Sequence, residues 1–337
     1  MSTNTTPLAA TTTNDASLMQ PVNVWGNDLV VAAWSHWNFV GSGYPGFYAV
    51  TASQDATTVT LTPSGTGGQV QAGGGVANNG TGVVMLDEGD VLQVMSSGGD
   101  LTGTQVNADK PIQVIGGHEC TNVPLNVTAC DHLEESMFPV QSLAKEYIVA
   151  PPVQVPNTNL LKAQIVRVVA TEANTAITFD PDQGANQVLT NAGDFIELPM
   201  TQAAFKVSGD KPILVVQYMV GQSAGFGTSD PAMLLTVPTA QYRNDYLFHA
   251  APSWQANFVD IIARRRDGHR RRGQRRQLDR DRGDRVLDRP RLAEQRRQRQ
   301  PHRRFRSKGR YLGLRRPELR QLLVPGRVGS RDQPAVK

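Results

Sequence analysis

The sequence predicts an all-β protein made of tandem β-sandwich-like repeats, with an incomplete third repeat and a disordered Arg-rich tail. Three observations predict this architecture. Short strand-like segments alternate with turn residues, three segments recur in order, and the composition changes abruptly after Ala263. A chain of 337 residues has room for two or three compact domains.

The strand-like segments are rich in Val, Ile, Thr and Tyr and are bounded by Gly, Asn, Asp or Pro, as short strands joined by turns should be. Clear examples are FYAVTASQDATTVTLTP (Phe47 to Pro63), VVMLDEGDVLQVM (Val83 to Met95) and ILVVQYMV (Ile213 to Val220). No segment carries a capped apolar period of 3.6 residues, although DHLEESMF (Asp131 to Phe138) favours a helical turn or two.

An internal repeat organises these strands. Three pairs of segments match in the same order, which indicates two copies of one unit of sandwich size. The pairs are ASQDATTVTL (52–61) with ATEANTAITF (170–179), EGDVLQV (88–94) with AGDFIEL (192–198), and ADKPIQVIGG (108–117) with GDKPILVVQY (209–218). A third copy begins at YLFHAAPSWQANFVDIIA (Tyr246 to Ala263).

The repeat gives a domain plan. We expect a disordered segment over 1–21, the first unit over 22–140, the second over 141–241, the start of a third over 242–263, and the tail over 264–337. The first segment has no basic start followed by an apolar run, so it shows no signal peptide, and we expect no membrane span.

The tail differs sharply in charge from the rest of the chain. Residues 1–263 hold 7 basic and 22 acidic residues, a net charge of −15, whereas the remainder holds 27 and 8, a net charge of +19. One interpretation is a basic arm that binds nucleic acid or another polyanion. Another is a solvated, unfolded segment.

A third interpretation is translation in the wrong frame. Back-translation of DGHRRR (Asp267 to Arg272) with a shift of one base gives Thr-Val-Thr-Val-Asp-Gly, a strand running into a turn. That is the Thr-rich strand that the third unit needs at this place. We favour this interpretation, with the frame lost near Ala263 or Arg264.

The only two cysteines, Cys120 and Cys130, lie in GGHECTNVPLNVTACDHLEES (Gly116 to Ser136). A disulfide between them would fix an irregular loop and would indicate a compartment outside the cytoplasm. The alternative is a zinc site of His118, Cys120, Cys130 and His132, and free thiols are a further one. We expect Asp131 and His132 to order the adjoining turn.

Catalytic motifs are weak. GQSAG (Gly221 to Gly225) matches G-x-S-x-G, with Asp230 and His249 following, which makes a serine hydrolase through Ser223 an alternative. The motif needs a helix after it, and FGTSDPAM does not begin one. No cofactor motif is expected, because QAGGGVANNG (Gln71 to Gly80) lacks the Lys-Ser/Thr of a phosphate-binding loop.

An aromatic cluster lies in AAWSHWNFVGSGYPGF (Ala32 to Phe47), preceded by Trp25. Its rings could form a platform for a sugar, although such clusters more often form core. The rings are Trp25, Trp34, Trp37, Phe39 and Tyr44.

Three longer segments resemble the IgGFc-binding protein N-terminal domain family, which occurs on secreted mucus proteins of animals and on many bacterial surface proteins. They are Gly99 to Val140, Arg167 to Asp180 and Ser229 to Ala250, within a similarity that runs from about Val24 to Ala263. The elements Leu-Thr-Gly-Thr, Lys-Pro, Gly-His and Cys-Asp-His carry it. The family's Tyr/Trp-Pro-Gly-Gly ending is absent as written and is recovered when the tail is shifted.

The resemblance implies an extracellular or cell-surface binding or adhesion module that is non-enzymatic, and the Gly-rich, GC-biased sequence suggests a bacterial member. It implies a protein or glycan ligand and no specific nucleic acid, and it transfers no IgG-binding residues to this chain. The two alternatives are polyanion binding through the tail and hydrolysis through Ser223.

Overall fold

A computed structural model describes residues 17–152, 161–227, 230–247, 259–263 and 320–323, the last as backbone only. By contacts, the chain divides into one unit of residues 1–241 with 326–337 and a second of residues 242–325. Among the described residues, none of the helices has the length and apolar character needed to cross a membrane.

The first repeat is an eight-stranded antiparallel sheet, with strands in the order β6-β8-β4-β9-β5-β7 and with β1 and β10 also paired to β9. A short two-stranded sheet, β2–β3, accompanies it. The strands are β1 (Gly26–Val30), β2 (Trp37–Phe39), β3 (Ser42–Tyr44), β4 (Gly46–Ala52), β5 (Thr57–Thr62), β6 (Gln69–Val70), β7 (Gly82–Leu86), β8 (Val91–Gly98), β9 (Gln105–Thr121) and β10 (Asp131–Ser136). One 3-10 turn, η1 (Val22–Val24), precedes them and another, η2 (Val140–Ser142), follows.

The second repeat is a seven-stranded sheet in the order β14-β13-β16-β12-β15, with β11 and β17 paired to β16. Its strands are β11 (Ala144–Val149), β12 (Gln164–Ala170), β13 (Thr175–Asp180), β14 (Gln187–Leu189), β15 (Phe195–Thr201), β16 (Phe205–Met219) and β17 (Ala232–Leu235). The 3-10 turns η3 (Gln222–Ala224) and η4 (Thr239–Gln241) flank β17.

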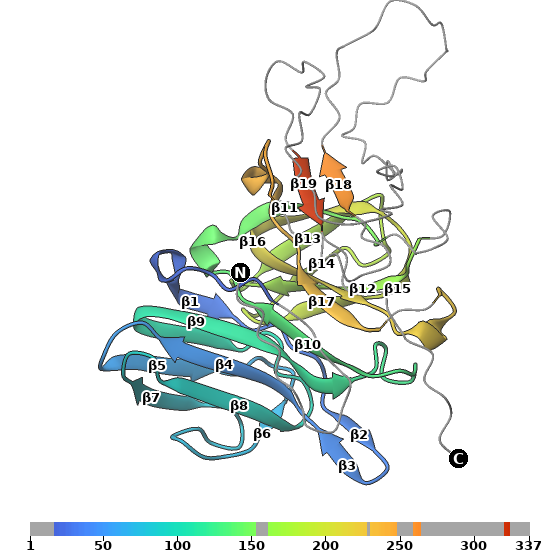
Figure 1. Ribbon diagram of the computed structural model, residues 1–337. Coiled ribbons are helices and arrows are strands. Elements are labelled where there is room, and N and C mark those ends of the chain that lie inside the picture. Colours follow the sequence, from blue (N-terminus) through green and yellow to red (C-terminus); the bar gives the residue numbers. More distant parts are fainter. Residues whose placement is uncertain (1–16, 153–160, 228–229, 248–258, 264–319, 324–337) are drawn as a thin grey trace, which may run out of the picture. The chain divides into compact units, whose positions relative to one another are not determined.

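Apart from β6, which has no counterpart among the described strands of the second sheet, the two sheets have the same topology (Figure 1). Each is curled about one long strand, β9 or β16, whose first half pairs with one set of strands and whose second half pairs with another. The register repeats as well, because Ala52 faces Ile112 in the first sheet as Ala170 faces Ile213 in the second. The predicted all-β fold of tandem sandwich-like repeats is confirmed.

The Asp-Lys-Pro motif explains why the sequence repeat is so clear. In the first repeat the backbone N–H of Thr58 donates to Asp109 Oδ1 at 2.8 Å, and in the second that of Ala176 donates to Asp210 Oδ1 at 2.8 Å. The motif ties the start of each Thr-rich strand to the bend of the long strand.

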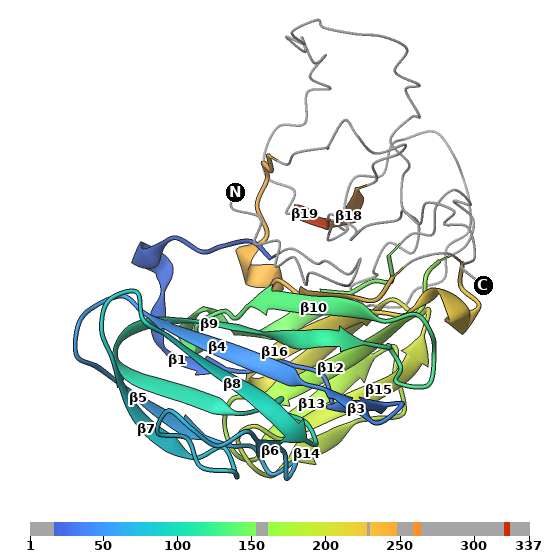
Figure 2. The same cartoon turned by 60° about the horizontal axis from the view of Figure 1, so that its bottom comes forward.

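The two sheets pack together through β12. All seven residues of this strand are buried, because alternate side chains point to opposite faces of a sheet and both faces are covered. Val166 and Val168 lie in the core of the second repeat. Ile165 and Val169 lie in a core shared with the first repeat. Figure 2 shows the two sheets as adjacent layers.

The helical turn predicted for Asp131 to Phe138 is wrong. Residues Asp131–Ser136 form β10, which pairs with β9 from Thr121 to Ile115. Backbone pairing with a long neighbouring strand overrides the weak local preference of this polar segment.

In the second unit of the chain, Asp260–Ala263 forms β18 and pairs antiparallel with β19 (Arg320–Leu323). The start predicted for the third repeat therefore contains a strand at its end. The rest of the predicted Arg-rich tail, 264–319 and 324–337, lies outside the described residues, as does most of the predicted N-terminal segment.

Candidate functional site

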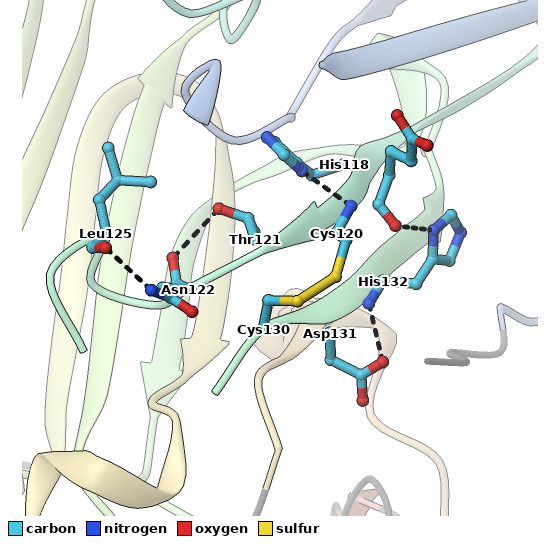
Figure 3. The surroundings of a disulfide bond; sticks show 9 residues. His118, Cys120, Thr121, Asn122, Leu125, Cys130, Asp131 and His132 are labelled. Atoms are coloured by element: carbon cyan, nitrogen blue, oxygen red, sulfur yellow. Dashed lines mark hydrogen bonds between the residues drawn. A yellow bond between two sulfur atoms is a disulfide. The ribbon is translucent and has the colours of Figure 1, made fainter. Parts of the chain in front are cut away.

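A disulfide closes the loop between β9 and β10. Cys120 lies next to the end of β9 and Cys130 directly before β10, with their Cα atoms 5.5 Å apart. Figure 3 shows the bond bridging the two strand ends. The described residues contain no free cysteine. The covalent link fixes the start and the end of an irregular nine-residue loop, residues 121–129.

The two histidines beside the disulfide have structural roles. His118 is buried, and its Nδ1 accepts a hydrogen bond from the backbone N–H of Cys120 at 3.2 Å. Burial, with nearby His36, lowers the pKa of His118 to about 3, so its ring is neutral at physiological pH. His132 stacks on Phe47, with ring centres 5.8 Å apart.

Asp131 is the first residue of β10, and its Oδ1 accepts the backbone N–H of the next residue, His132, at 2.8 Å. Both nitrogens of the His132 ring also have partners. Nδ1 lies 3.1 Å from the Glu119 backbone oxygen, and Nε2 lies 3.4 Å from Glu134 Oε2. These contacts hold the ring against the sheet.

The alternative zinc site needs two thiolates. Cys120 and Cys130 are bonded to each other, and sulfur atoms in a disulfide are not thiolate ligands. Among the described residues, no group of three or more His, Cys, Asp or Glu is arranged to hold a metal ion. The geometry therefore favours the bridge over the zinc alternative.

The loop lies against its own counterpart from the second repeat. Residues 220–231 connect β16 to β17 just as the disulfide loop connects β9 to β10. The backbone N–H of Gly221 donates to Val123 O at 2.9 Å, and that of Ser223 donates to Thr128 O at 2.9 Å. Equivalent loops of the two repeats thus form one joint surface.

The hydrolase alternative finds no support in this arrangement. Ser223 is exposed on the single 3-10 turn η3 instead of on a sharp turn into an α-helix. Its backbone N–H is engaged with the disulfide loop. Asp230 is half-buried, and His249 lies outside the described residues.

A second feature, the buried Arg167, joins the two repeats. It extends from β12 of the second repeat, and its side chain is 3% exposed. Nη1 donates to Ala33 O and to Thr102 Oγ1, both at 2.9 Å, and Nη2 lies 2.9 Å from Asp100 Oδ2. Glu197 of the second repeat adds an ion pair at 2.8 Å. The acceptors from the first repeat lie in the Leu-Thr-Gly-Thr region and after β1.

Aromatic rings surround the guanidinium. Its carbon lies 4.3 Å from the ring centre of Trp34, 4.8 Å from Phe195 and 5.4 Å from Tyr218. Such contacts stabilise a buried cation. Tyr218 also donates its hydroxyl to Ala33 O at 2.7 Å, so the same backbone carbonyl accepts from both side chains.

The charges at this junction support each other. Burial alone would raise the pKa of Asp100, but Arg167 and the hydrogen bonds from Ser35 and Thr102 hold it below its usual value. Burial would likewise lower the pKa of Arg167, and Asp100 instead raises it. Both groups therefore stay charged inside the protein.

The predicted aromatic cluster divides into two parts. Trp34 is buried at the junction, with its ring centre 4.6 Å from that of Tyr218. Trp37, Phe39 and Tyr44 instead lie together on the β2–β3 hairpin. Trp25 is half-buried, and its Nε1–H donates to Gln20 O at 2.9 Å.

Arg167 was not among the residues predicted from the sequence. A signal was present, since Arg167 is the only arginine before Arg243 and lies in QIVRVVA, a strand that is otherwise apolar except for Gln164. An isolated charge within such a strand indicates a buried, paired group. Its partners from the first repeat are a backbone oxygen and side chains in or beside the distant Leu-Thr-Gly-Thr motif, and nothing in the local sequence pairs them with Arg167.

Comparison with known proteins gives a consistent result. A family model described as IgGFc binding protein matches residues 15–283, most of the chain. The human protein named IgGFc-binding protein is 26% identical over 209 residues. That match covers 61% of this chain but only 4% of the human protein. No solved structure matches.

Proposed function

Because the chain belongs to the IgGFc-binding protein family, we propose that its β repeats form an extracellular or cell-surface module that binds or adheres to a protein or glycan and catalyses no reaction. The family relationship supports a binding role. The chain spans a small part of its human relative, so IgG binding is one ligand among those to be tested.

The disulfide-closed loop is the observation that carries the proposal. It is an irregular segment held covalently at both ends and hydrogen-bonded to the equivalent loop of the other repeat. Loops that a rigid scaffold positions are the usual place of binding sites. A disulfide also suits an oxidising compartment outside the cytoplasm.

The test is a glycan and protein array, including an IgG Fc fragment, probed with the full-length chain and with Cys120→Ser/Cys130→Ser. The proposal expects at least one ligand that the double variant binds more weakly. It fails if the thiols are free in the protein from its own cells and the protein stays in the cytoplasm.

For the domain plan, we propose the boundaries 22–140, 141–241 and 242–263. Equivalent strands support the first two units, since β1 and β11 each pair with the long strand with the same bulge. For the third, β18 ends at Ala263, which aligns in sequence with Ala52 and Ala170 at the ends of β4 and β12.

We also propose that residues from about Ala263 onward are read in the wrong frame. The support is the strand-like sequence recovered by one constant shift. The family match continues to residue 283, so a correct but divergent frame is the competing outcome. Sequencing the DNA around codon 264 decides between them, because an extra or missing base there would remove the basic arm.

A further inference from the structure

The β2–β3 hairpin projects from the first repeat. It is a two-stranded sheet outside the eight-stranded one, and Figure 1 shows it extending beyond β4 and β8. Trp37 pairs with Tyr44, and Phe39 pairs with Ser42. The turn between the strands is Val40–Gly41, with φ angles of 49° and 78°.

Val40 is an unexpected residue for that turn. A two-residue hairpin turn with both φ angles positive favours Asn-Gly, and a β-branched side chain is strained there. Packing of the Val40 side chain does not offset this strain, because Val40 is 86% exposed. The neighbouring Gly41 also lies in open space, since a Cβ added there would meet nothing within 4 Å. An exposed, strained valine gives the fold no packing that Asn would lack, and strained positions of this kind occur at functional sites.

Three rings stand behind this tip. Trp37 stacks on Phe39 with ring centres 4.9 Å apart and an angle of 21° between their planes, and lies 5.3 Å from Tyr44. Trp37 stacks on Phe39 and is tilted against Tyr44, so the three rings form a ladder instead of a flat platform for a sugar. Phe39, next to the tip, is 53% exposed, whereas Trp37 and Tyr44 are half-buried.

The polarity therefore changes along the hairpin. Val40 and Phe39 form an apolar end, and the amphipathic rings of Trp37 and Tyr44 form a collar behind it. From Leu29 to Gln54 the sequence contains no Asp, Glu, Lys or Arg. An apolar tip, a Trp/Tyr collar and no charge match the polarity gradient of a lipid–water interface. The absence of basic residues selects electrically neutral headgroups.

We propose that Phe39 and Val40 insert into the boundary between headgroups and acyl chains of a zwitterionic lipid surface, with Trp37 and Tyr44 at headgroup level. This activity is separate from the ligand binding proposed above. Insertion is shallow and crosses no bilayer, and with two side chains it is weak and reversible.

The test is co-flotation of the full-length chain with phosphatidylcholine vesicles in about 0.5 M salt, where electrostatic attraction of the Arg-rich tail is screened. Val40→Asn should reduce the partition coefficient about tenfold, since it removes most of one apolar anchor. The same variant should unfold at the same or a higher temperature, because Asn suits the turn. Lower binding with unchanged or higher stability excludes a merely structural role.

Val83→Asn is the matched control. Val83 is 66% exposed on β7, a regular strand away from the hairpin, and its substitution should leave flotation unchanged. Equal flotation of Val40→Asn and the unchanged chain would overturn the proposal, as would equal losses in both variants or no flotation of the unchanged chain. If the chain did not float with vesicles but bound an arrayed protein less well after Val40→Asn, the tip would bind a protein pocket and not lipid. Array ligands unaffected by Val40→Asn would leave the proposed function standing whichever result the vesicles give.

Discussion

The two repeats share a scaffold and differ in what they attach to it. In both, a Gly at positive φ donates its backbone N–H to the last residue of the neighbouring strand, Gly89 to Ala52 and Gly193 to Ala170. The disulfide loop and the β2–β3 hairpin belong to the first repeat, and the buried arginine, Arg167, belongs to the second. The shared parts explain folding, and the unshared parts are the junction and the two proposed binding sites.

The largest expected effect comes from breaking the junction. Arg167→Met leaves Asp100 buried without its partner, and we expect a loss of about 3–5 kcal/mol in the free energy of unfolding. Urea denaturation measures it.

Lys206→Met is the control for that loss. The Lys206 ammonium lies 3.9 Å from Glu146, and its side chain is 25% exposed, so we expect a change of at most about 1 kcal/mol. Similar losses in both variants would show that Arg167 does not join the repeats as described.

The second effect tests the loop that only the first repeat closes covalently. Cys120→Ser/Cys130→Ser should lower the free energy of unfolding by about 2–3 kcal/mol, since an open loop of this length gains conformational entropy in the unfolded chain. Hydrogen exchange should rise in β10 and in residues 220–227, which contact the loop. Exchange that rises equally in β13 and β14 would contradict a local role.

The third effect concerns pH. His118 is neutral in the folded protein with a pKa of about 3, below its usual value near 6.5. The unfolded chain therefore binds a proton that the folded chain rejects. His118 stabilises the fold fully above about pH 6.5 and loses that stabilisation as the pH falls, by at most about 1.4 kcal/mol per pH unit.

Met219 occupies the position of His118 in the second repeat, so His118→Met tests this difference directly. The slope of unfolding free energy between about pH 6.5 and pH 4.5 should become flatter in the variant. An unchanged slope would assign the acid sensitivity to other groups. Below that range Asp100, whose pKa is lowered, adds a further loss as it is protonated.

The smallest effect compares the equivalent turn residues Ala56 and Asn174, at φ 49° and 55°. Alanine is strained at positive φ, whereas Asn tolerates it, so Ala56→Gly should raise the free energy of unfolding by about 0.5–1 kcal/mol. Asn174→Gly should change it by a few tenths at most. Thermal denaturation of the two variants measures both changes. Equal changes would contradict the claim that alanine is strained in this turn and asparagine is not.

The features that could be predicted from the sequence are those with a local signal. Strand composition and the Asp-Lys-Pro motif recur in both repeats because each copy needs the same turns, so the fold class and the repeat could be predicted. The pairing of Cys120 with Cys130 was limited by their number to one intramolecular bridge.

The junction could not be predicted, because its geometry depends on distant groups. Arg167 meets Ala33 and Asp100, which are 134 and 67 positions away in the sequence. The aromatic cluster divided for the same reason, since Trp34 is buried against Tyr218 of the other repeat. Residues 131–136 look polar and turn-like until their pairing with β9 is known.

The central claim is that ligand binding belongs to the β repeats and not to the Arg-rich tail. The most direct test titrates the first array ligand against three proteins: the unchanged chain, a chain ending at Ala263, and Cys120→Ser/Cys130→Ser. We predict that truncation leaves the dissociation constant unchanged and that the double variant raises it at least about tenfold. Binding that disappears with the tail and weakens steeply with salt, while the double variant binds normally, would contradict the claim.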